Sequence, residues 1–317
     1  MGGVRALSYP GVSVMLWPVG MADTSPDAGS PAPRADTLAG IALTMGAPAC
    51  FAALDASGKW LNQAGNPVGT AAVRYVAGFL LVGLFINPWG RAGLPRSRSP
   101  GMQVARAGFL VVATLCSMFA YRSLPMTQAA AITFAAPLMV AAIAGPLLGE
   151  WIGWRGALAV LAVFGGVLVI TRPAAGVQLA SLLALGTAAA NALYIVATRF
   201  LAGRDSSRTT LFYTGLVGAA AALPALPFTW RPPVTALGWA VTAAMAVLAS
   251  LGHWLLILAH RRAPASLLAP FSYAQLLWAA VLGGVVFGEV PDRWTLAGGA
   301  VVIAAGLCLL SLQRRRV

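Results

Sequence analysis

The chain has 317 residues, of which 59% are hydrophobic and only 9% charged, and its formal net charge is +13. A soluble domain carries roughly 25% charged residues, so this composition excludes a soluble globular enzyme and a disordered chain. One membrane-spanning helix needs roughly 20 apolar residues, and the hydrophobic and glycine residues, about 222 together, allow about ten such helices. Cys50, Cys116 and Cys308 lie far apart within apolar segments, which excludes a disulfide-stapled secreted module. We therefore predict an all-α integral membrane protein.

The first 36 residues differ in composition from the rest and are rich in Pro, Ser, Asp and Gly. Residues 1–36 are therefore predicted to be a disordered tail. Pro10 and Pro18 interrupt the apolar stretch near the N-terminus, which argues against a signal peptide. Translation beginning at Met15 or Met21 is the alternative that this composition favours.

From Leu38 onward, the chain alternates between apolar segments and short polar connectors. Each apolar segment is about long enough to cross a bilayer as a helix, and the short connectors make neighbouring helices antiparallel. The ten predicted spans are 38–57, 69–88, 104–121, 127–148, 156–171, 179–200, 210–229, 236–259, 265–288 and 295–313.

The 21 basic residues are scattered between the spans, a pattern that does not form a patch for tracking phosphates, so we expect no nucleic-acid partner. Cytoplasmic loops carry an excess of Lys and Arg, and this rule sets the orientation of the chain. With the N-terminus inside, 15 basic residues are cytoplasmic and six are external. We therefore expect a multi-pass protein of the cytoplasmic membrane with both termini in the cytoplasm. The external six are Lys59, Arg74, Arg122, Arg172, Arg231 and Arg293.

An internal repeat gives the strongest indication of function. Residues 121–150 align without a gap to residues 260–289, with nine identities, and both copies end in Gly-Glu. The offset of 139 residues divides the chain after the fifth span, and because five is odd the second copy enters the membrane in the opposite orientation. The sequence thus predicts two inverted five-helix repeats, 37–173 and 177–317. Inverted repeats are typical of secondary transporters, in which the two halves exchange conformations to open the cavity on alternate sides.

The segments PMTQAAAITFAAPLMVAAIAGPLLGE and APFSYAQLLWAAVLGGVVFGE, together with the five-plus-five plan, resemble the drug/metabolite transporter superfamily, specifically its EamA domain family. The resemblance covers residues 38 to about 312 and implies a carrier of small organic metabolites. The second copy looks most like the branch that contains S-adenosylmethionine and riboflavin carriers. One departure is that Pro137 is replaced by Leu276, whereas the second copy has Pro270, so its helix is expected to bend nearer the opposite end.

Charged groups within spans are expensive, and each calls for an explanation. Asp55 lies near the outer end of the first span, with Lys59 four residues later on the same helical face. One hypothesis is an i,i+4 ion pair at the interface. The other is a gating or coupling acid that exchanges partners with Arg74, at the start of the second span.

Glu150 and Glu289 close the fourth and ninth spans. A carboxylate at a helix C-terminus is unfavourable with the helix dipole, so its position indicates another contact. We expect each to bind backbone N–H groups or a neighbouring arginine, such as Arg155 or Arg293, and to lock the hairpin as a structural motif.

Polar and aromatic residues near the predicted midplane are the candidates for the substrate cavity. Singly, each is explained by hydrogen bonding between helices. Together they predict a cavity with almost no fixed charge, suited to a neutral, zwitterionic or flat aromatic ligand. They are Asn191, Tyr194, His253, Trp254, Ser272, Tyr273 and Gln275.

The same inventory of side chains separates the possible functions. His253 is the one side chain within a span that titrates near neutral pH, so protons are a possible partner beside the small-molecule substrate. We predict no catalytic residue, metal or cofactor, since an ATP-binding loop and paired intramembrane acids are absent from the sequence. The sequence predicts a secondary transporter, in the bilayer as a monomer or homodimer. A channel or receptor-like scaffold is the alternative, and a membrane-embedded enzyme a more remote one.

Overall fold

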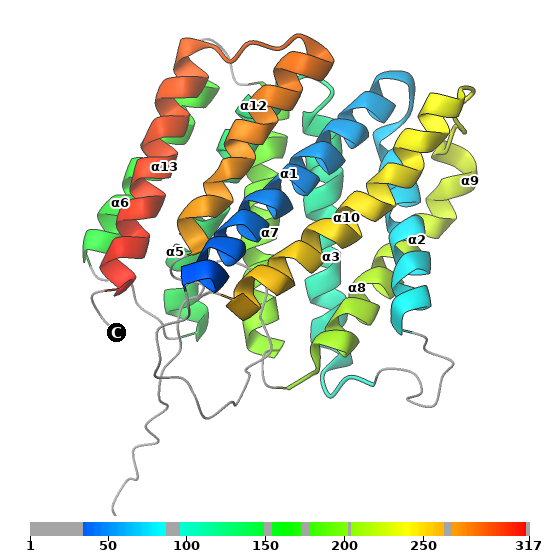
Figure 1. Ribbon diagram of the computed structural model, residues 1–317, viewed down its shortest axis with the longest axis horizontal. Helices are drawn as coiled ribbons and strands as arrows, with labels where there is room; N and C mark the ends of the chain where they lie inside the picture. The colour runs from blue at the N-terminus through cyan, green and yellow to red at the C-terminus, as the bar shows by residue number, and fades with distance from the viewer. Residues whose placement is uncertain are drawn as a thin grey trace, which may run out of the picture.

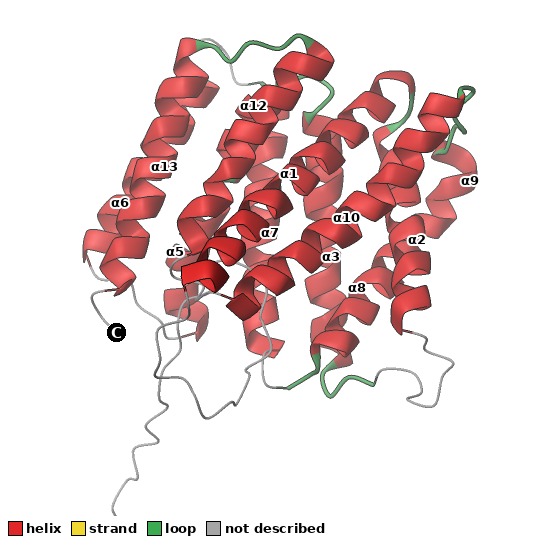
Figure 2. Ribbon diagram, viewed as in Figure 1, coloured by secondary structure: helices red, strands yellow, loops and turns green. Residues whose placement is uncertain are grey.

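The structure is a computed structural model that describes residues 34–86, 96–148, 154–172, 178–201, 204–262 and 268–314. Every regular element within these ranges is a helix (Figure 2). Residues 1–33 of the expected tail lie outside them, and the first helix begins at Arg34.

The first repeat consists of five apolar helices, the fourth of which is interrupted. Its elements are α1 (Arg34–Ala64), α2 (Pro67–Ile86), α3 (Pro100–Ala120), α4 (Met126–Thr133) with α5 (Ala136–Leu148), and α6 (Trp154–Thr171).

The second repeat has the same plan. Its elements are α7 (Leu179–Leu201), α8 (Ser207–Ala222) continued by η2 (Leu223–Ala225) and α9 (Leu226–Thr229), α10 (Ala236–Arg262), η3 (Ala269–Tyr273) with α12 (Ala274–Phe287), and α13 (Arg293–Arg314). Four helical segments of the described chain are long and apolar enough to cross a membrane, and six shorter ones are apolar. These ten segments coincide with the ten predicted spans, so the predicted fold class is confirmed.

The helix contacts indicate an approximate twofold axis that exchanges the repeats. Figure 1 shows the arrangement of the helices. The first span, α1, packs on α10, the eighth, and the third span, α3, packs on α7, the sixth. The exchange interconverts these two pairs. The remaining pairs, α2 with α8, α4 with α12 and α6 with α13, each join a helix to its own counterpart. Such self-paired contacts are what an inverted repeat requires.

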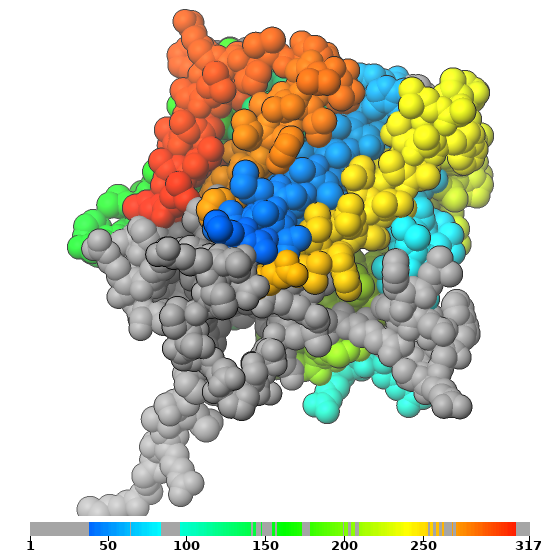
Figure 3. All heavy atoms as spheres, viewed as in Figure 1, coloured from blue at the N-terminus to red at the C-terminus, as the bar shows by residue number. Residues whose placement is uncertain are grey.

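The first helix of each repeat lies against the opposite repeat. Figure 3 shows α12, α1 and α10 side by side across one face, so α1 lies between two helices of the second repeat. In the same way, α7 packs on α3, α4 and α5 of the first repeat. The repeats are therefore interlocked, and the core is shared between them.

Both repeats interrupt their fourth helix at the same level. In the first, α4 ends at Thr133 and α5 begins at Ala136, just before Pro137, whose ring removes a helical hydrogen bond. In the second, Pro270 lies within the 3₁₀ segment η3, which aligns with residues 130–134. Pro137 follows the interruption of its helix, whereas Pro270 lies within the aligned segment, so the two bends are at nearly the same level. The expected shift of the second bend toward the opposite end is therefore small.

Candidate functional site

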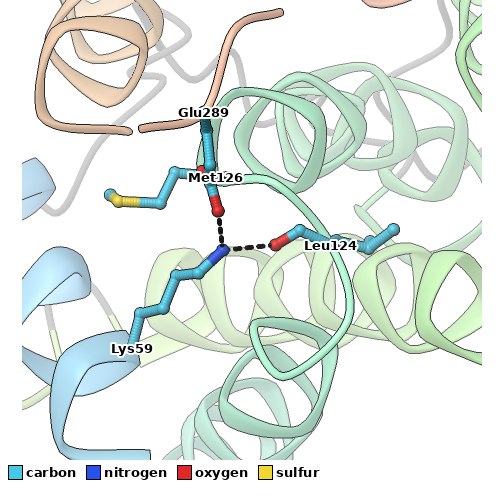
Figure 4. Close-up of polar contacts among 4 residues, drawn as sticks. All are labelled: Lys59, Leu124, Met126 and Glu289. Carbon is cyan, nitrogen blue, oxygen red and sulfur yellow. Dashed lines mark hydrogen bonds and ion pairs between the residues drawn. The ribbon is translucent and has the colours of Figure 1, made fainter. Parts of the chain in front are cut away.

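A buried ion pair joins the two repeats at one end of the bundle (Figure 4). The ammonium of Lys59, on α1, contacts the carboxylate of Glu289, which follows α12, and donates to the Leu124 carbonyl at 2.7 Å. The other carboxylate oxygen of Glu289 accepts from the Met126 N–H at 2.8 Å. The side chains of the pair are 8% and 19% exposed, and the Phe287 ring lies 5.2 Å from the ammonium. We call Lys59, Leu124, Met126 and Glu289 the outer node, because the sequence analysis expects this end of the bundle to be external.

The local sequence explains how Glu289 reaches this position. Gly288 ends α12 in the left-handed region at φ 66°, and its N–H and that of Glu289 donate to the carbonyls of Gly284 and Gly283. The chain thereby turns back and aims Glu289 at the start of α4, where the Met126 N–H has no partner within its own helix. A carboxylate is favourable at a helix N-terminus, which accounts for the Gly-Glu ending.

The outer node corrects one expectation and refines another. Lys59 does not pair with Asp55 along α1 but with Glu289, from the other repeat. Sequence spacing within a helix could not reveal this partner, because it lies 230 residues away. Glu289 binds a backbone N–H as expected, whereas Arg293 stacks on Trp294, 5.3 Å from the ring centroid. Glu150 lies outside the described residues.

A second set of charges lies one helical turn deeper on α1. Asp55 is partly buried and faces the Tyr121 hydroxyl and the Arg74 guanidinium of α2. The structure thus brings together Asp55 and Arg74, which the sequence singled out, and adds Tyr121. An acidic and a basic side chain from neighbouring helices therefore lie close together within the bundle.

Counterpart residues of the repeats meet at the middle of the bundle. The rings of Phe134 and Tyr273, which occupy the same position in the two copies, are 5.1 Å apart. A residue that touches its own counterpart lies close to the twofold axis, as at the interface of a symmetric dimer. Tyr273 is 8% exposed, and its hydroxyl packs against the backbone of Gly306.

The remaining cavity candidates lie on three elements of the second repeat. Asn191 and Tyr194 are on α7, and Ser272 and Gln275 are on η3 and the first turn of α12. All four are partly buried. All four belong to the second repeat, and their role in a substrate cavity stays a prediction.

One of the 15 basic residues that the sequence analysis counted as cytoplasmic is part of the core. Arg106, on α3, is 1% exposed and donates to Gln103 Oε1 at 3.3 Å, to the Thr210 carbonyl at 2.8 Å and to the Thr214 hydroxyl. Its guanidinium lies 5.0 Å from the centroid of the Tyr194 ring. The feature of the sequence that could have predicted this network is the position of Gln103 and Arg106, one helical turn apart at the start of an apolar segment.

This network continues to a carboxylate at the end of the bundle opposite the outer node. Asp205 accepts from Gln103 Nε2 at 2.9 Å, from the Arg98 N–H at 2.8 Å and from the Ser97 hydroxyl. Partial burial alone would raise the pKa of Asp205, but these hydrogen bonds hold the pKa below its usual value. We call Ser97, Gln103, Arg106, Asp205, Thr210 and Thr214 the inner network, because the sequence analysis expects this end of the bundle to be cytoplasmic.

Trp254 is misplaced by the sequence analysis. It is 58% exposed and lies on one face of α10 with Val247 and Leu251, which are also exposed. An exposed apolar stripe on a spanning helix faces lipid, so Trp254 belongs to the surface. The side chain of His253 lies outside the described set. Within the described chain, no three His, Cys, Asp or Glu residues could hold a metal ion.

Known proteins resemble this chain over most of its length. The chain is 26% identical to an S-adenosylmethionine uptake transporter of Rickettsia bellii, covering 82% of this chain and 89% of the relative. It is 28% identical to a riboflavin transporter of Vibrio cholerae (84% and 91% covered) and 26% identical to a pseudopaline exporter of Pseudomonas aeruginosa (85% and 95%). A crystal structure at 19% identity superposes with a TM-score of 0.59, covering 89% of this chain and 98% of the other, which shows the fold.

The family model for EamA-like transporters matches twice, at residues 38–172 and 178–312. The two matches meet between α6 and α7, where the helix packing divides the chain into its repeats. A membrane transporter, and not an enzyme, is therefore confirmed. The chain belongs to the EamA-like transporter family.

Proposed function

We propose that this transporter moves a small zwitterionic metabolite across the cytoplasmic membrane by alternating access of its two repeats, with both termini in the cytoplasm. The observation that carries the proposal is the outer node, because it ties α1 of the first repeat to the end of α12 in the second. A passage to the outside between these helices opens only when Lys59 and Glu289 separate.

The outer node is suited to a reversible closure. In the closed state its charges are shielded from water and satisfied by each other, by a carbonyl and by an N–H. In an open state, water hydrates both charges, so the cost of separating them is offset by solvation. A purely apolar seal would have no such compensation, because opening would expose apolar surface to water.

The charges below the node indicate the class of substrate. Asp55 and Arg74 present one acidic and one basic group from adjacent helices, beside the Tyr121 hydroxyl. The Phe134 and Tyr273 rings lie close to the axis. A zwitterion with an ammonium and a carboxylate matches both charges without leaving a net charge in the membrane. The relatives named above carry S-adenosylmethionine, riboflavin and pseudopaline, which supports a small organic cargo.

The experiment is counterflow in proteoliposomes, with labelled S-adenosylmethionine and riboflavin as probes and an amino-acid pool as competitors. Asp55→Asn and Arg74→Gln should each reduce saturable uptake of a zwitterionic probe, whereas Arg231→Gln, an exposed residue of the same end, serves as control. Competition by zwitterions that these variants leave unchanged would refute the substrate class. Flux that neither saturates nor shows counterflow would favour a channel.

Energy coupling is tested in the same vesicles. If a proton accompanies the substrate, an imposed pH gradient changes the final accumulation, and His253→Gln flattens its dependence on pH. Unchanged rates and accumulation in the wild type identify facilitated diffusion or exchange and exclude proton coupling.

A further inference from the structure

A groove lies between α6 and α13 at the end of the bundle that holds the inner network. It has a volume of about 550 Å³, and its lining is almost entirely apolar. Leu158 and Ala162 form the α6 side, and Val301, Ala304 and Cys308 form the α13 side. The groove is on the outside of the bundle, away from the Phe134–Tyr273 axis and the outer node.

The shape of the groove follows from how its two helices cross. α6 and α13 approach most closely at Gly166 and Gly298, where a Cβ on Gly298 would lie 2.5 Å from the Gly166 carbonyl oxygen. The lining residues of α6 all precede this crossing, and those of α13 all follow it. Because the helices are antiparallel, both sets lie on the same side of the crossing, where the helices diverge and alanines leave the space between them unfilled.

The mouth of the groove has a different chemistry from its floor. Trp154 and Arg155, the first two residues of α6, line it, and both side chains are exposed. The Arg155 guanidinium lies 5.3 Å from the Trp154 ring centroid. Trp is typical of the boundary between hydrocarbon and headgroups. In the described part of the chain no carboxylate lies within ion-pair distance of Arg155.

We propose that this groove is a binding site for an anionic phospholipid, with one acyl chain along α6 and α13 and the phosphate on Arg155. An apolar trough that ends in an exposed guanidinium at the level of the headgroups complements such a lipid in both polarity and charge. α13 also ends at Arg314, so both helices that flank the groove end in basic residues on the same membrane side. The positive-inside rule places this side in the cytoplasm, where the leaflet carries anionic lipid.

The test is lipid retention by the full chain in native mass spectrometry, with phosphatidylglycerol and phosphatidylcholine of identical acyl chains. The wild type should retain one phosphatidylglycerol in preference to phosphatidylcholine. Arg155→Gln should weaken that preference about fivefold, the effect of one basic residue at an anionic surface. Arg231→Gln, exposed at the other end of the bundle, is the matched control and should leave it unchanged.

A second variant tests the floor of the groove. Ala304→Phe places a ring in the trough at an exposed position, so folding is preserved while the acyl chain is displaced. Retention of both lipids should fall in this variant. Equal retention of the two lipids by the wild type, or an unchanged preference in Arg155→Gln, would overturn the proposal. A dimer that Ala304→Phe dissociates would also overturn it, because a second copy would then occupy the groove.

Discussion

The pairing of Lys59 with Glu289 predicts a large coupling energy between two residues 230 positions apart. Removing one partner of a buried ion pair costs about 3–5 kcal/mol, because the other charge is left uncompensated. Here Glu289 is 19% exposed and keeps the Met126 N–H, while Lys59 keeps the Leu124 carbonyl. We therefore expect a smaller loss, about 2–3 kcal/mol for Lys59→Met and for Glu289→Gln, and a double variant only slightly less stable than either single variant.

The assay is unfolding of the purified protein in mixed micelles, followed by tryptophan fluorescence for the wild type, both single variants and the double variant. The exposed pair Arg172–Asp292, 2.7 Å apart with side chains 44% and 39% exposed, is the matched control, and its cycle should give about 0–1 kcal/mol. Losses at Lys59 and Glu289 that add to within about 0.5 kcal/mol would refute the reasoning, because independent sites are additive to that degree.

Three further expectations concern packing, pH and the lipid surface. Gly306→Ala should destabilise the protein by about 1–3 kcal/mol, since its Cβ would overlap the Tyr273 hydroxyl and lie 2.7 Å from Cζ; the same change should cost less when it is made in a Tyr273→Ala background, in the same unfolding assay. Asp205→Asn should remove a pH-dependent contribution to the free energy of unfolding. Because the pKa of Asp205 is lowered in the folded state, its carboxylate stabilises the fold above the unfolded-state pKa of about 3.9, and this contribution disappears as the pH falls through the folded-state pKa. Thermal unfolding at pH 7 and pH 3.5 measures it, and an equal pH dependence in both proteins would contradict it. Trp254→Leu should leave counterflow unchanged, since the side chain faces lipid; reduced saturable transport in folded protein would return Trp254 to the cavity.

The sequence predicted the ten spans and the inverted repeat, but not the contacts between side chains of different helices. Span positions and the inverted repeat follow from apolar length and from the Gly-Glu endings, which depend on local chemistry. The partner of Lys59 depends on tertiary packing between α1 and α12, which no spacing along α1 encodes. Arg106 shows the same limit. Its position near the end of a span predicts a cytoplasmic cation, and only the packing of α8 reveals the Thr210 carbonyl to which it donates.

Rotation about the helix axis was the other quantity that the sequence could not supply. The sequence analysis placed Trp254 in the cavity by depth alone, whereas its side chain is exposed on the face of α10 that carries Val247 and Leu251. An apolar helix that faces lipid on one side and protein on the other has little contrast in polarity between its faces, so periodicity gives a weak indication of orientation. Tyr273 is buried and contacts its repeat counterpart, Phe134, while its role in the cavity stays a prediction.

The interlocking of the repeats has a consequence for synthesis in the cell. Lys59 enters the membrane with α1, but Glu289 is made 230 residues later, which is about 12 to 46 s at typical elongation rates of roughly 5–20 residues per second. Until α10 is translated, α1 has neither α10 nor α12 to pack against, since both belong to the second half of the chain. The nascent first half must therefore keep the unneutralised Lys59 ammonium near the aqueous surface until the ninth span is in place. Glu289, just after α12, then completes the contacts of α1, the first helix to be inserted.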